Sequence, residues 1–179
     1  MKRVLWIPAL ILFSACTKLA QTLDQLTHIT LNYEASYTLP TTDSVYNNLE
    51  LRADSIETNI QSRLAANNTS RELIEGMTVK EIKIFIDSPM SQQFDPLTDA
   101  EVYISGNNLT EAKVAYVNGI TDDINQTLDM QMEGTELKPY LIQDYFSSRV
   151  VLKTDQIIPQ NTKIRCEMKF TLDAKVLGQ

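Results

Sequence analysis

Alternation of apolar and polar side chains is the strongest pattern along the chain, and it predicts β-strands. It is clearest in residues 30–39 and 164–176, where every second side chain is apolar. A period of two is typical of a strand with one face on a core and the other in water. Shorter stretches with the same alternation predict further strands at residues 82–86, 100–104, 112–116, 128–132 and 149–153.

Residues 45–64 have a different spacing, which predicts an amphipathic helix. Asp43 or Ser44 is suited to cap its start, because a short side-chain oxygen accepts hydrogen bonds from the free amides of a first turn. The apolar stripe would pack on the domain's own sheet or against a partner helix in a coiled coil. A shorter helical segment is predicted at residues 137–145. The stripe recurs every three or four residues and consists of Val45, Leu49, Ala53, Ile56, Ile60 and Leu64.

These elements together predict a mainly β or α+β domain over residues 29–179. About seven strands with polar outer faces favour antiparallel sheets, because parallel sheets bury both faces and have solid apolar strands. The turn residues Gly106-Asn107-Asn108 predict a hairpin between two of the strands. We therefore expect an antiparallel, β-sandwich-like domain with one long and one short helix.

The first residues have the pattern of a secretion signal. Lys2 and Arg3 precede the apolar residues 4–13, and small residues follow before Cys16. Ten residues would rise only about 15 Å as a helix, roughly half the thickness of a bilayer core. The segment therefore predicts a signal peptide at residues 1–15 and a polar tether at residues 16–28.

The stretch Phe13-Ser14-Ala15-Cys16 resembles the lipobox of bacterial lipoproteins, although that family prefers leucine where Phe13 stands. The resemblance implies cleavage before Cys16, diacylation of its thiol and a lipid anchor in the cell envelope, with the outer membrane as the expected location. A soluble secreted form, cleaved after Cys16, is the alternative.

The net charge of the chain limits the kinds of partner that it can bind. Without Lys2 and Arg3 the chain keeps 14 basic and 23 acidic residues, a net charge of −9. Nucleic acid is an unsuitable partner, because affinity for a phosphate backbone depends on clustered Lys and Arg. The same charge repels anionic lipid surfaces, so membrane attachment would depend on the acyl chains of Cys16.

Few residues in the sequence are candidates for catalysis or metal binding. His28, the only histidine, lies beside the tether, and no serine stands in a nucleophile-elbow sequence. Cys166 shares the apolar face of the last strand, which predicts a buried and inert thiol. One His and one remaining Cys are too few for a usual zinc site, so we expect neither a catalytic site nor a cofactor.

Two weaker groups remain as candidate ligand sites. Oxygen-rich loops can hold calcium, although the EF-hand spacing is absent and acidic loops are usually solvated. Strand tyrosines can line a ligand surface, or they can cap a core edge. The calcium candidates are Asp95, Asp99, Asp122 and Asp123, and the tyrosines are Tyr33, Tyr37, Tyr103 and Tyr116.

Three functions stay open on this basis. The first is a non-enzymatic envelope lipoprotein that binds another envelope protein or supports an assembly. The second is a module that binds a small molecule or glycan. The third is a hydrolase that uses two carboxylates which converge in space.

Overall fold

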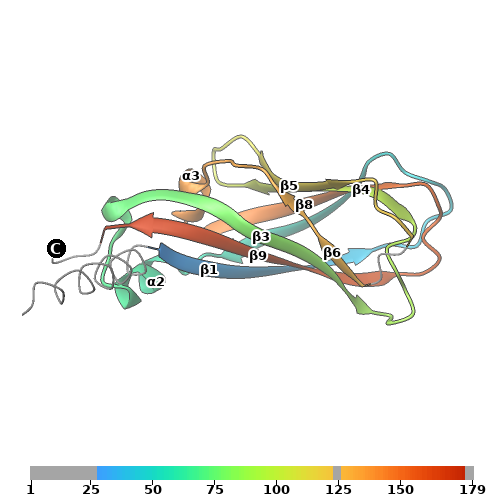
Figure 1. The fold of residues 1–179 in the computed structure, drawn as a ribbon, viewed down its shortest axis with the longest axis horizontal. Coiled ribbons are helices and arrows are strands. Elements are labelled where there is room, and N and C mark those ends of the chain that lie inside the picture. Colours follow the sequence, from blue (N-terminus) through green and yellow to red (C-terminus); the bar gives the residue numbers. More distant parts are fainter. Residues whose placement is uncertain (1–27, 123–125, 176–179) are drawn as a thin grey trace, which may run out of the picture.

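The computed structural model describes residues 28–122 and 126–175, which form a sandwich of two antiparallel β-sheets (Figure 1). The predicted fold class is confirmed, with nine strands in the described ranges where about seven were expected. The first sheet has the order β1 (His28–Leu39), β9 (Thr162–Ala174), β3 (Ile74–Ser88), β6 (Thr127–Asp129). The second has the order β2 (Leu49–Glu57), β8 (Tyr145–Thr154), β4 (Leu97–Ser105), β5 (Ala112–Asn118), β7 (Gln131–Met132).

The core lies between the two sheets, and the alternating strands supply it. β1 and β9, the two most strongly patterned segments, pair over the whole length of β1, from His28 opposite Asp173 to Leu39 opposite Thr162. Their inward apolar side chains are at most 7% exposed, except Ile29 near the start of β1, which is partly buried. Burying a large apolar side chain stabilises a fold by roughly 1.5–3 kcal/mol. The alternation therefore specified both strands correctly.

The long helix predicted at residues 45–64 is wrong. Residues 49–57 form β2, which pairs with β8, and only Ile60–Ala66 form a helix, α2. Val45 is exposed in a loop, and neither Asp43 nor Ser44 caps a helix. The apparent stripe arose because a β-bulge between Ala53 and Ile56 shifts the alternation by one residue. The free edge of β8 then supplied backbone hydrogen bonds that an isolated stretch of sequence does not reveal.

The strand predicted at residues 128–132 is two strands in different sheets. Leu128 of β6 lies opposite Ile84 of β3, whereas Gln131 of β7 lies opposite Tyr116 of β5. Met130 stands between them and is buried. The segment thus passes from one sheet to the other and closes that side of the sandwich.

Smaller differences concern the boundaries. The predicted helix at residues 137–145 is only α3 (Lys138–Leu141), and Tyr145 already begins β8. The predicted hairpin is confirmed, because β4 and β5 pair antiparallel with Ile104 opposite Ala112. None of the helices in residues 28–122 and 126–175 is long and apolar enough to cross a bilayer.

The sandwich has two different ends (Figure 1). The helical end carries α2, α3 and His28, where the described chain begins. The loop end carries the connections 40–48, 89–96 and 155–161 and the described residues 119–122 after β5. β1 runs from the helical end to the loop end, and twelve residues at about 3.3 Å each separate the two by roughly 40 Å.

Candidate functional site

The four tyrosines proposed as a ligand surface lie in two separate places. Tyr33 and Tyr37 are buried between the sheets, where their hydroxyls donate to the Thr58 carbonyl at 3.0 Å and to the Ser148 Oγ at 2.8 Å. Burial raises the pKa of Tyr33 to about 12. These two side chains are core residues, as their place in the alternation with Leu31, Ala35 and Leu39 indicates. The other two, Tyr103 and Tyr116, are partly exposed on β4 and β5.

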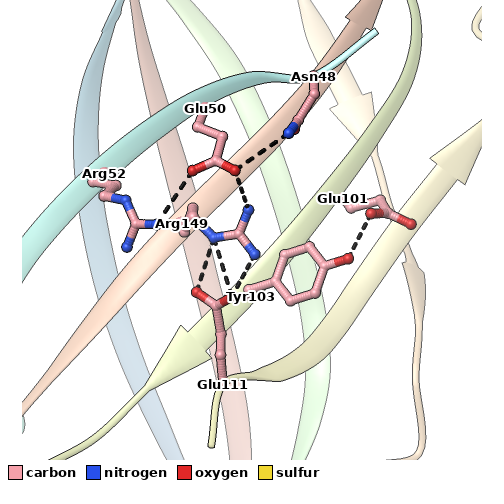
Figure 2. Close-up of polar contacts among 7 residues, drawn as sticks. All are labelled: Asn48, Glu50, Arg52, Glu101, Tyr103, Glu111 and Arg149. Atoms are coloured by element: carbon pink, nitrogen blue, oxygen red, sulfur yellow. Dashed lines mark hydrogen bonds and ion pairs between the residues drawn. The ribbon is translucent and has the colours of Figure 1, made fainter.

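Tyr103 belongs to a charged network on the outer face of the second sheet, centred on Arg149 of β8 (Figure 2). The Arg149 Nε donates to Glu111 Oε1 at 2.9 Å, and its Nη1 lies 3.1 Å from Glu50 Oε1. The guanidinium carbon lies 4.4 Å from the centre of the Tyr103 ring, a cation–π contact. The Tyr103 hydroxyl donates to Glu101 at 2.6 Å. Three strands and a loop thus place these groups together.

The electrostatics of this network fit a structural role better than catalysis. The hydrogen bond from Arg149 lowers the pKa of Glu111, whereas a general acid at neutral pH needs a raised one. The hydrogen bond to Glu101 raises the pKa of Tyr103 and so keeps its hydroxyl protonated. Lys113 lies 5.2 Å from the centre of the Tyr116 ring and contacts Glu133 at 3.3 Å. The cations of this face are therefore engaged by neighbouring carboxylates and rings.

Cys166 is fully buried, as the alternation predicted. Burial raises the pKa of its thiol to about 12, so the reactive thiolate is scarce at neutral pH. His28 lies at the helical end, with its Nδ1 3.0 Å from Asp173 Oδ1. Cys16 and its proposed lipid lie outside the described residues.

Three of the four acidic calcium candidates lie at the loop end. Asp95 and Asp122 lie in its loops, and Asp99 lies on β4, where it accepts from the Thr98 hydroxyl at 2.8 Å. Asp123 lies outside the described residues. Within residues 28–122 and 126–175, no three His, Cys, Asp or Glu side chains come close enough to hold a metal ion.

The hollows of the surface lie mainly at the helical end. One of about 600 Å³ is bordered by α2, Glu57, Asp144 and Tyr145, and it is open to solvent. Asp144 Oδ1 accepts from Arg71 Nη2 at 2.8 Å. Although two carboxylates border the hollow, one of them is held by a cation, and this arrangement provides no ready acid–base pair.

The loop end presents a feature that the sequence analysis missed, namely exposed large apolar side chains. Of the five such residues in the described ranges, four lie in its loops, and the fifth, Tyr145, is at the helical end. Val45 belongs to the predicted helical stripe, and Tyr46, Met90 and Ile157 follow no periodic pattern from which their exposure could be predicted. Their exposed fractions are 56% for Val45, 37% for Tyr46, 67% for Met90 and 53% for Ile157.

Hydrogen bonds tie the loops of this end to one another. The Thr42 amide donates to the Ile158 carbonyl at 3.0 Å, and the Thr154 amide donates to the Tyr46 carbonyl at 2.8 Å. The Asp155 amide donates to the Pro96 carbonyl at 3.3 Å. The apolar side chains are therefore held on a connected framework.

Comparison with known proteins gives a weak structural similarity. No family model and no curated protein matches the chain. Among solved structures, a chain from Desmodium yellow mottle tymovirus is 12% identical, covers 99% of this chain and 98% of its own, and has a TM-score of 0.26. A similarity of this size carries no argument about function.

Proposed function

We propose that this protein is a lipid-anchored envelope protein that binds another envelope protein through its loop end, without catalysis. The observation that carries the proposal is the position of the exposed apolar residues. Four of the five exposed large apolar side chains in the described ranges lie in the loops of this one end, and apolar surface exposed in one region commonly marks an interaction site.

The anchor and the fold agree with this arrangement. The described chain begins at the helical end, roughly 40 Å from the loop end. An anchor on Cys16 would hold the helical end toward the membrane, because the tether leads directly into β1. The loop end would then face away from the bilayer, where a partner protein can reach it.

Site-specific photo-crosslinking in the native envelope tests the proposal. A photoreactive amino acid replaces Ile157 in one variant and Tyr145 in a matched control, since these side chains are 53% and 52% exposed. We expect a discrete crosslinked product from position 157 and none from position 145. Equal products from both positions, or none from position 157, would remove the loop end as the binding surface.

The anchor needs its own test. The parent should incorporate labelled palmitate and sediment with membranes in high salt, because its acyl chains and not its charge attach it. Cys16→Ser should lose the label, and it should remain as precursor or appear in the soluble fraction. A parent without label that salt releases would contradict the anchored form.

A further inference from the structure

The loops of the loop end differ from the rest of the chain in charge as well as in exposed apolar area. The described segments 40–48, 89–96, 119–122 and 155–161 contain no Lys, Arg or His. They contain four aspartates, which are Asp43, Asp95, Asp122 and Asp155.

None of Asp43, Asp95, Asp122 and Asp155 takes part in an ion pair among the residues that the structure describes. Lys153 at the end of β8 is the nearest cation along the chain to Asp155, and it contacts Asp99 at 3.6 Å. On the outer faces of the sheets, by contrast, acidic side chains are paired with basic ones. Glu81 contacts Lys169, and Glu111 contacts Arg149. The loops that carry the exposed apolar side chains therefore also carry acidic side chains and no basic ones of their own.

From this combination we infer that the partner is a protein surface on which apolar side chains are surrounded by Lys and Arg. The inference rests on the proposed function and names the chemistry of the partner. Apolar contacts would supply affinity, and the surrounding aspartates would attract cations and repel acidic proteins. An anionic lipid surface or a nucleic acid would meet the same repulsion.

A pair of short synthetic peptides provides the probe. In one, leucine alternates with lysine, and in the other leucine alternates with glutamate. Binding to the full chain, purified in a neutral detergent, is measured by fluorescence anisotropy at low and high salt. Partition of the peptides into micelles is common to all variants and cancels when the variants are compared.

We expect the lysine peptide to bind and added salt to weaken it, while the glutamate peptide does not bind. Ile157→Ser with Met90→Ser should weaken binding about tenfold or more, because hot-spot side chains carry most of the affinity. Tyr145→Ser, the matched change at the helical end, should leave binding unchanged. These side chains are exposed, and an unchanged melting temperature will show that each variant is folded.

A second pair of variants tests how much the negative charge of the loop-end aspartates contributes to binding. Asp43→Asn with Asp155→Asn should weaken the lysine peptide severalfold and reduce the effect of salt on binding. Glu57→Gln with Glu72→Gln removes two exposed acids at the helical end and should change neither. Equal losses from the two pairs would show that only overall charge matters, and this would overturn the inference.

The outcomes separate this inference from the proposed function. A crosslink at position 157 without selective binding of the lysine peptide would leave the proposed function standing and remove the cationic partner. Selective binding of the lysine peptide without any crosslink in the envelope would support the chemistry of the surface and contradict the proposed function.

Discussion

The two ends of the sandwich use the same kinds of residue in opposite ways. At the helical end, Ile60 and Leu64 of α2 are buried and Arg71 pairs with Asp144. At the loop end, Val45, Met90 and Ile157 are exposed, and aspartates stand without cations in the same loops. Ile60 and Leu64 thus contribute to the core from the helical end, whereas Val45, Met90 and Ile157 leave apolar surface exposed for binding at the loop end. Three of the predictions below compare one change at or near each end, and one concerns the network between them.

The largest difference should come from removing one apolar side chain. Ile60 is 1% exposed, so Ile60→Ala leaves a cavity and should lower the free energy of unfolding by about 2–5 kcal/mol. Ile157→Ala should change it by less than about 0.5 kcal/mol, because water already surrounds that side chain. Urea denaturation of both variants measures the difference. Similar losses would mean that the Ile157 side chain is packed in the folded protein and is not free for a partner.

Alkaline pH should distinguish a buried tyrosine near the helical end from an exposed one at the loop end. Tyr33→Phe removes the hydrogen bond to the Thr58 carbonyl, which should cost about 1–3 kcal/mol at pH 7. Tyr46→Phe should cost little, because Tyr46 is exposed and its described hydrogen bonds are made by its backbone.

The sign of the pH effect follows from the pKa of Tyr33, which burial raises to about 12 from the usual value near 10. The unfolded chain releases this proton first, so the stabilising contribution is complete below pH 10 and is lost as the pH rises toward 12. The parent and Tyr46→Phe should lose stability over this range, and Tyr33→Phe should lose less. Identical pH profiles for the two variants would contradict the raised pKa.

The network around Arg149 lies between the ends and should have a smaller effect. Glu111→Gln removes one charged partner of a largely covered guanidinium, so we expect a loss of about 1 kcal/mol at pH 7. The hydrogen bond from Arg149 lowers the pKa of Glu111 in the folded protein. The contribution is therefore present above the usual pKa of glutamate and is lost as the pH falls through the folded value. Thermal melts at pH 7 and in acid should show a difference between parent and variant that shrinks in acid.

The smallest effects should have opposite signs at the two ends. Asp43→Asn at the loop end should raise stability by a few tenths of a kcal/mol, because it removes a negative charge from loops that contain no cation in an acidic chain. Asp144→Asn at the helical end should lower it by a similar amount, because it breaks the pair with Arg71. Added salt should reduce both changes. Two changes of the same sign would show that the ends do not differ in charge balance.

The sequence by itself determined the strands in which apolar and polar side chains alternate along the whole length. β1 and β9 alternate without interruption, so both strands, the inward side of Tyr33 and Tyr37 and the burial of Cys166 could be read from period alone. The hairpin of β4 and β5 could be predicted because its turn residues are local. A local pattern is enough to predict a strand when every second side chain is buried, because successive side chains point to opposite faces of a sheet.

Only the tertiary structure decided the features that depend on contacts between distant residues. Residues 49–57 became a strand because β8 supplied an edge and a bulge shifted their alternation, and residues 127–132 were divided between two sheets because each half found a different partner. The loop end could not be predicted from local pattern, because its four segments are far apart in sequence and have no common period. They lie at the same end because antiparallel pairing brings the same ends of the strands together, and this pairing places Val45, Met90, Ile157 and the described aspartates of these loops at one end of the sandwich.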